Sequence, residues 1–345
     1  MNRNSLYPVK LIIGIALLVS ASTTAWGEEP YKGKTLRFIV AYSPGGGFDT
    51  YTRAIARHIS KHIPGHPTTI VQNMTGAGGF IAANYMYNKA KPDGLTIGNF
   101  IGGLVQQQIL GNKGVKFDGR KFEWIGVPVV DHPVCGLTKV TGIKNIKDWQ
   151  AAKRPIKVGG IGPGGTVSDV PRVLAAALGL PVKVIDGYRG TAKVRLAAEA
   201  GELAGGCWAW QSMKVTWRRM VESGGVRIVL QAMDKKHPEL GNVDNAIDFA
   251  KTDEARALLK YGIHDTATIT RFYSLPPRTP KKIVKLLRKA FMDTMRDPKF
   301  LSEAKKSKLE INPVTGERVE KIVQGMFKLD AKMVSRLKEI LVPKR

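Results

Sequence analysis

Cysteine and acidic residues are both scarce in this chain of 345 residues. It has only two cysteines, and two thiols in a chain of this length do not form a disulfide framework. Cys135 and Cys207 lie in apolar surroundings, so we expect two small buried thiols, and whether they are bridged stays open. Asp and Glu number 28 against 54 Lys and Arg, which gives a net charge of +26. A field of this sign could attract nucleic acid, anionic membranes or small acids.

The basic residues do not follow the pattern of a nucleic-acid-binding protein. They are spread along the chain, are densest between Lys281 and Lys308, and are not interleaved with aromatic residues as in single-strand binders. We therefore expect no nucleic-acid partner, whereas steering of small anions remains open. Long apolar runs are missing as well, because Leu11–Val19 is too short to cross a membrane.

The N-terminus has the three-part layout of a secretory signal peptide. Arg3 and Lys10 precede the apolar run, and small residues follow it as far as Gly27. We expect residues 1–27 to be a signal peptide that is cleaved near Gly27. The mature protein would then reside in the periplasm.

Catalytic and metal-binding motifs are missing too. Neither glycine-rich segment carries the Lys-Ser/Thr pair of a phosphate-binding loop, and Ala41 stands where a nucleophile elbow needs its first glycine. His58, His62 and His66 have a metal-like spacing, but a Pro-Gly pair ends the helix before the third histidine. We expect no enzymatic activity, no cofactor and no metal site.

Two strand-to-helix transitions share a glycine-rich design. The apolar run Leu36–Tyr42 indicates a buried strand, Gly45–Gly47 follows it, and Asp49 is a natural N-cap for the next helix. Ile156–Gly159 is a second such strand, followed by the loop Gly160–Thr166 and another helix. Free N–H groups and the positive end of a helix dipole make such a point an anion site, although a plain tight turn is the alternative.

The segment RFIVAYSPGGGFDTYTRAIARHI, followed by VQNMTGAGGFIAANYMYNKAKPDGLTIGNF, resembles the solute-binding proteins of tripartite tricarboxylate transporters, the Bug or TctC-like proteins. Three motifs of that family occur in order, at Pro44–Asp49, Asn73–Gly79 and Pro92–Thr96. Further similarity at Gly162–Thr166, at Tyr188–Gly190 and in RFYSLPPRTPKKIV extends the resemblance over essentially the whole mature chain.

The resemblance implies an α/β fold, a two-lobed periplasmic binding protein of the type II-like clamshell class. Each lobe would be a mixed sheet flanked by helices, and two crossover strands would join the lobes. We expect lobe 1 to comprise residues 30–128 and 271–345, and lobe 2 to comprise residues 129–270. The family also implies a monomeric receptor that captures a small carboxylate and delivers it to the large and small membrane subunits of a permease. A sensor that presents its ligand to a signalling receptor is the alternative.

The resemblance further implies that backbone N–H groups of the two glycine loops hold the ligand carboxylate. The candidate ligand-binding residues of lobe 1 are Tyr42, Ser43, Gly46, Gly47, Phe48, Asp49, Ile101 and Gly102. Those of lobe 2 are Gly164, Gly165, Thr166, Ser168, Asp186, Tyr188, Trp208 and Trp210. Alternation places Trp208 and Trp210 on one face of a strand, either as an aromatic wall or as core packing. Di- and tricarboxylates, aromatic acids, and amino or nicotinic acids therefore remain candidates, and the two tryptophans slightly favour an aromatic or bulky acid.

Overall fold

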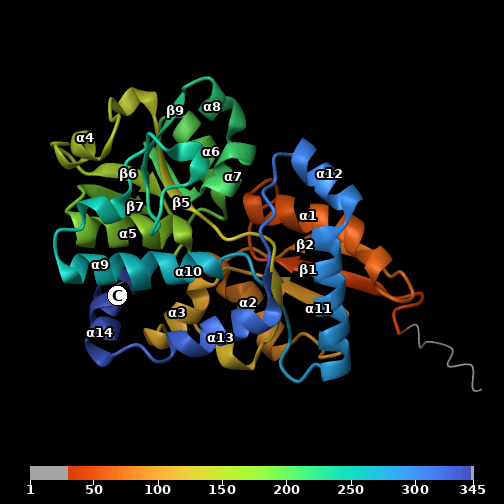
Figure 1. The fold of residues 1–345 in the computed structure, drawn as a ribbon. Helices are drawn as coiled ribbons and strands as arrows, with labels where there is room; N and C mark the ends of the chain where they lie inside the picture. The colour runs from red at the N-terminus through yellow and green to blue at the C-terminus, as the bar shows by residue number, and fades with distance from the viewer. Residues whose placement is uncertain (1–29, 343–345) are drawn as a thin grey trace, which may run out of the picture.

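The structure is a computed structural model that describes residues 30–342, so the predicted signal peptide lies outside the described residues. Two α/β lobes lie side by side in Figure 1, one coloured mainly red, orange and blue and the other yellow, green and cyan. Because the two ends of the chain contribute to the same lobe, its strands come from distant parts of the sequence. The predicted fold class is confirmed.

The first sheet has six strands in the order β11-β4-β10-β3-β1-β2. β1 is parallel to β2 and β3, whereas β10 is antiparallel to β3 and β4, and β11 is antiparallel to β4. The strand bounds are β1 (Thr35–Val40), β2 (Thr68–Asn73), β3 (Thr96–Asn99), β4 (Glu123–Val127), β10 (Tyr273–Leu275) and β11 (Val314–Thr315).

Helices cover both faces of this sheet. Ile55 and Ile59 of the amphipathic helix α1 are fully buried and share a core with Leu287 and Phe291 of α11 and Phe300 of α12. The helices of this lobe are α1 (Gly47–Ile59), α2 (Phe80–Asn88), α3 (Gly103–Ile109), α11 (Lys281–Arg296), α12 (Pro298–Lys306) and α13 (Gly316–Met326).

The second sheet has five strands in the order β7-β6-β8-β5-β9. β6 is parallel to β7 and β8, and β5 is antiparallel to β8 and β9. The strands are β5 (Pro133–Thr138), β6 (Ile156–Gly159), β7 (Val182–Ile185), β8 (Gly205–Ala209) and β9 (Val226–Gln231). The helices are α4 (Ile146–Gln150), α5 (Thr166–Leu178), α6 (Thr191–Glu199), α7 (Trp210–Thr216), α8 (Arg218–Glu222), α9 (Asp253–Leu259) and α10 (Asp265–Thr268).

The C-terminal helix α14 (Ala331–Leu341) packs against this second lobe, below α9 in Figure 1. Its residues Leu337 and Leu341 are fully buried in the core that contains Val173 and Leu174 of α5. The end of the segment 271–345 therefore lies against lobe 2. The lobe boundaries expected from the sequence stay a prediction.

The expectation of two free thiols was wrong. Cys135 of β5 and Cys207 of β8 form a disulfide, with their Cα atoms 4.0 Å apart. They are bridged because the antiparallel register of β5 and β8 sets the two residues directly opposite each other. Their separation of 72 residues in the sequence gives a loop-closure stabilisation of about 4 kcal/mol in the chain-entropy model.

Two short links, residues 128–132 and 269–272, connect the sheets. They are irregular segments and not the crossover strands expected from the family resemblance, because neither is part of a sheet ladder. Their backbone groups bond to other segments: the Asp131 N–H, for instance, donates to the Ala267 carbonyl of α10 over 3.3 Å. Both links pass beside the boundary between the lobes, where they can act as a hinge.

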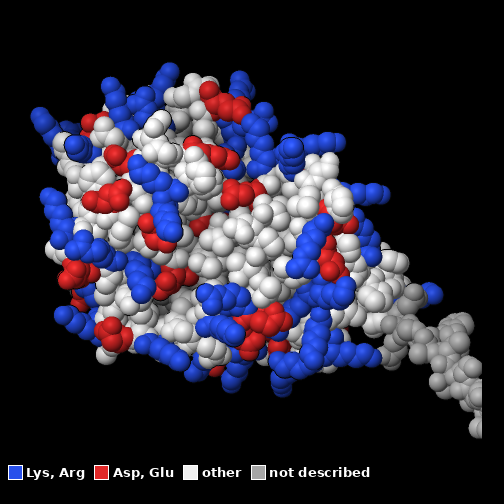
Figure 2. All heavy atoms as spheres, in the orientation of Figure 1, with Lys and Arg blue, Asp and Glu red and all other residues white. Residues whose placement is uncertain are grey.

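Lys and Arg side chains are distributed over both lobes on the face drawn in Figure 2, while the strip between the lobes is largely uncharged. On this face the Lys and Arg side chains are interspersed with Asp and Glu and do not form a single basic patch. Among residues 30–342, no helix combines the length and the apolar character needed to cross a bilayer.

Candidate ligand-binding cleft

A small cavity of about 30 Å³ lies between the two lobes. This volume has room for roughly two water molecules. Seven of the candidate residues line it: Tyr42, Gly46, Gly47, Phe48, Ile101, Thr166 and Trp208. Its wall also contains nine residues that the sequence did not single out as binding residues, among them Asp131, Thr191, Ser212, Thr270 and Arg271. The cavity therefore forms where the two glycine loops and the two hinge links meet.

Three helices begin at this cavity without a capping side chain. The N-cap residues of α1, α5 and α6 are Gly46, Gly165 and Gly190, and none of the three helix starts has a side-chain cap. The first N–H groups of a helix have no partner within the helix, and the helix dipole adds a partial positive charge at this end. Three such ends at one cavity provide an environment that suits an anion.

Asp49 does not have the N-cap role expected for it. The helix begins two residues earlier, at Gly47, and Asp49 lies in its first turn. One Asp49 oxygen accepts from the Gly45 N–H at 2.9 Å, and the carboxylate also accepts from Arg53 and Asn73. Burial alone would raise the pKa of Asp49, but these hydrogen bonds outweigh burial and hold it below its ordinary value. Asp49 thus fixes the shape of the first glycine loop.

Ser168 and Asp186 fix the second glycine loop in the same way. The Ser168 hydroxyl is fully buried, accepts from the N–H groups of Ile161 and Gly162, and donates to Asp186 at 2.6 Å. Asp186 also forms an ion pair with Arg172. Neither side chain lines the cavity, so the structure favours the loop-stabilising role for Asp186.

Asp169 lies next to this loop and is fully buried. Its Oδ2 accepts from the Gly164 N–H at 2.9 Å, whereas Oδ1 has no hydrogen-bond partner. Burial raises the pKa of Asp169 to about 8, and the nearby Arg172 offsets this only in part. The carboxyl is therefore largely protonated at neutral pH, so it adds little negative charge beside the cavity.

The expected tryptophan wall is only half present. Trp208 belongs to β8, lines the cavity and stacks on Trp217 with ring centroids 5.3 Å apart. Trp210 opens α7, and its indole N–H donates to Glu239 at 2.6 Å. The prediction that both residues share one face of a strand was wrong, because β8 ends at Ala209 and the chain turns there into a helix.

The remaining candidates do not line the cavity; they are Ser43, Gly102, Gly164, Gly165 and Tyr188. The Ser43 N–H donates to the Arg189 carbonyl of lobe 2 at 3.0 Å, and the Gly102 N–H donates to Thr270 of the hinge at 3.3 Å. The Tyr188 N–H donates to the Gly160 carbonyl, which also belongs to lobe 2. Gly164 and Gly165 form the turn before α5, and Gly164 lines a separate small cavity beside Asp169. Their roles in binding stay a prediction.

The glycines have a second role, which is to let the lobes touch. A Cβ on Gly103 would overlap the carbonyl of Gly164, and a Cβ on Gly47 would overlap the side chain of Ser212. A Cβ on Gly190 would likewise crowd Ser43, at 2.5 Å from its hydroxyl oxygen. Each of these contacts crosses from one lobe to the other. The lobes are therefore closed on each other around the cavity, at a separation that only glycine permits.

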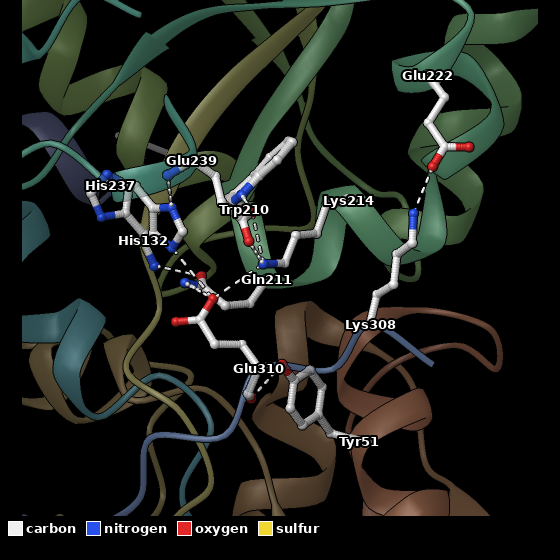
Figure 3. A network of polar contacts seen from close by, with 10 residues as sticks. All are labelled: Tyr51, His132, Trp210, Gln211, Lys214, Glu222, His237, Glu239, Lys308 and Glu310. Carbon is white, nitrogen blue, oxygen red and sulfur yellow. Dashed lines mark hydrogen bonds and ion pairs between the residues drawn. The ribbon is translucent and has the colours of Figure 1, made fainter. Parts of the chain in front are cut away.

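A network of polar side chains joins the lobes beside the cavity (Figure 3). Glu310 of lobe 1 is at its centre and contacts Gln211, Lys214 and His237 of lobe 2, each at 3.3 Å. A second ion pair, Lys308 to Glu222 at 2.7 Å, is about half exposed and is therefore weak. We call these six residues the interlobe polar network.

A second histidine, His132, adjoins the interlobe polar network and packs on its member His237. The rings of His132 and His237 pack edge to face, with centroids 5.2 Å apart. Burial lowers the pKa of His132 to about 4, although its hydrogen bond with Gln231 acts in the opposite direction. His132 is therefore neutral near pH 7, and the two rings pack without like-charge repulsion.

The histidines with metal-like spacing do not form a metal site. His58 bonds to Glu303 at 2.7 Å and His62 bonds to Asp297 at 3.1 Å, so each pairs with a carboxylate of α12 or its cap. Within residues 30–342, no group of three or more His, Cys, Asp or Glu side chains is arranged to hold a metal ion.

The sequence of the chain matches a known family of transport receptors. The family model described as the tripartite tricarboxylate transporter family receptor, TctC, matches residues 51–339. Two curated relatives are 33% and 31% identical to the chain over 89 and 86 residues, so the chain aligns with only 26% of the length of each.

Solved structures resemble the chain over most of its length. The periplasmic binding protein BugD superimposes with a TM-score of 0.73 at 22% sequence identity. The alignment covers 91% of this chain and 100% of the BugD chain. A Rhodopseudomonas palustris protein, Rpa4515 with adipate, has a TM-score of 0.71 at 18% identity, covering 89% of this chain and 98% of its own. MatC of the same organism, with bound malate, has a TM-score of 0.68 at 17% identity, covering 89% and 99%. At these identities the likeness establishes the fold.

Proposed function

The chain belongs to the tripartite tricarboxylate transporter receptor family, TctC, whose members are periplasmic solute-binding proteins and not enzymes, and on this basis we propose that it captures a small carboxylate between its lobes. The ligand is then delivered to the membrane subunits of a permease of the same family. The proposal is carried mainly by one observation: three uncapped helix N-termini meet at a single cavity between two lobes.

The arrangement explains how a carboxylate could be held without a binding side chain from either glycine loop. The N–H groups of Gly47 and Phe48 in α1, and of Thr166 and Val167 in α5, lie in the first turns of their helices. These groups have no partner within a helix and can donate to carboxylate oxygens, and hydrogen bonds to an ionised acceptor are short and strong. The protonated Asp169 avoids repelling the anion.

The wall of the cavity, and not its closed volume, bears on which acid is bound. A volume of about 30 Å³ is less than a dicarboxylate requires, so the lobes must part slightly to admit one. Trp208 is the single tryptophan in the cavity wall, and its ring is already stacked on Trp217. We therefore favour short aliphatic acids over ring-bearing ones. The proteins solved with malate and with adipate are consistent with this choice.

Thermal unfolding of the mature protein, first refolded to remove any bound ligand, tests the proposal. The panel contains succinate, malate, adipate and benzoate, with the neutral diamide of succinate as the control. An acid at about a hundred times its dissociation constant stabilises the folded state by roughly 2.7 kcal/mol, which raises the midpoint of unfolding. No response to any acid, or an equal response to the diamide, would contradict the carboxylate proposal.

A further inference from the structure

Arg271, in the second hinge link, is the one arginine side chain in the wall of the cavity. The residue is only 2% exposed. Its Nε donates to Asp131 of the first link at 2.5 Å. The guanidinium carbon also lies 5.1 Å from the ring centre of Phe48 and 4.9 Å from that of Tyr51. The guanidinium is therefore held from three sides, and its orientation is fixed before any ligand arrives.

One donor group of this guanidinium is left without a partner. Nη1 of Arg271 is buried and makes no hydrogen bond. It lies beside the first turn of α1, because a Cβ built on Gly47 would be 2.9 Å from it. A buried charged donor without an acceptor is costly in a folded protein. An anionic acceptor bound beside the first turn of α1 would therefore satisfy both Nη1 and the free N–H groups of that helix.

We propose that Nη1 of Arg271 is the ionic anchor of the site and binds one carboxylate oxygen of the ligand. This inference rests on the proposed function and deepens it, because it assigns a charged residue to a grip otherwise made of backbone groups. The Asp131 carboxylate stays paired with Nε, so the ligand does not have to displace it. The site then selects for an ionised acid over its neutral amide.

The alternative is that Arg271 only fixes the hinge through its pair with Asp131. The substitution Asp131→Asn separates the two roles, because it removes the ion pair and keeps the guanidinium charge. If Arg271 only fixes the hinge, loss of the ion pair weakens acid binding. If Arg271 binds the ligand, its freed guanidinium holds the acid more tightly than in the wild type, since a negative charge beside the site is gone. The double variant Arg271→Met/Asp131→Asn removes both charges and leaves no unpaired carboxylate behind.

The experiment is a calorimetric titration of malate and of adipate into the mature protein at pH 7. We expect Asp131→Asn to bind severalfold more tightly than the wild type, and the double variant to bind at least about tenfold more weakly than Asp131→Asn, as expected for a lost hydrogen bond to a charged group. The control Arg336→Met removes an exposed arginine of α14 that pairs with Glu254 and Glu339, and it should leave both affinities unchanged.

A second double variant, Arg271→Gln/Asp131→Asn, keeps hydrogen-bond donors at the site and guards against misfolding of the Met variant. It too should bind at least about tenfold more weakly than Asp131→Asn, because it lacks the charge. Equal affinities of Asp131→Asn and either folded double variant would overturn the anchor while the proposed function stands. If the wild type binds neither malate nor adipate, the titration is repeated with succinate and benzoate. Binding of none of the four acids would contradict the proposed function, and the anchor with it.

Discussion

Asp169 is a single buried group that makes the stability of the fold depend on pH. Its pKa of about 8 in the folded protein exceeds the ordinary value of 3.8. Between these two values the unfolded chain has lost this proton while the folded chain keeps it. The contribution of Asp169 to stability is therefore fully present below about pH 4 and is lost as the pH rises towards 8 and beyond.

The substitution Asp169→Asn tests this linkage, because asparagine resembles the neutral acid in shape and can still accept from Gly164. We expect the variant to match the wild type near pH 4 and to become the more stable of the two as the pH rises to 8. The difference can grow by at most about 1.4 kcal/mol per pH unit. Urea unfolding of both proteins at several pH values measures it. A constant difference across this range would show that Asp169 is ionised in the folded state.

At the scale of elements, the contact between α3 and the second glycine loop determines whether the lobes can close. Gly103 is the first residue of α3, and an added Cβ would overlap Gly164 only across the lobe boundary. Alanine is otherwise well tolerated in a helix. Gly103→Ala should therefore leave the stability of the ligand-free protein within about 1 kcal/mol of wild type while weakening acid binding at least about tenfold.

Gly325→Ala is the matched control for this prediction. Gly325 lies in α13, and a Cβ there would meet no atom within 4 Å. This variant should raise stability slightly and leave acid binding unchanged. Equal binding by Gly103→Ala and the control would mean that closure at α3 is not needed for binding.

The sequence predicted those parts of the molecule that depend on local pattern. The two strand-to-helix loops, the two-lobed α/β fold and the family follow from short motifs, and the structure and the comparisons confirm the fold and the family. The disulfide was missed because it depends on the register of β5 and β8, which no local pattern specifies. Trp210 was misplaced because the sequence gives no signal for the end of β8 at Ala209.

Arg271 was missed for a related reason. Its sequence neighbourhood resembles the family's closing helix motif, and nothing local marks it as buried. Its place in the cavity arises only because the two hinge links run side by side and bring Asp131 to its Nε. Residues of both glycine loops line the cavity, but their contacts between the lobes could not be predicted because they depend on how the two lobes pack.

At the scale of the whole molecule, the positive surface and the closed cleft can act in sequence. The chain has a net charge of +26, which attracts anions to its surface, and on the face drawn in Figure 2 the strip between the lobes is largely uncharged. Closure then brings the glycine contacts and the interlobe polar network together. A ligand that adds contacts to the closed state and not to an open one shifts the population towards the closed state.

The most direct test of this account is small-angle X-ray scattering of the mature protein, without ligand and with the acid that stabilises it most in thermal unfolding. We expect the radius of gyration of the wild type to be smaller with the acid than without it. For Gly103→Ala we expect no such decrease. A radius that stays the same while the acid binds to the wild type would contradict the claim that the ligand is held by closure of the two lobes.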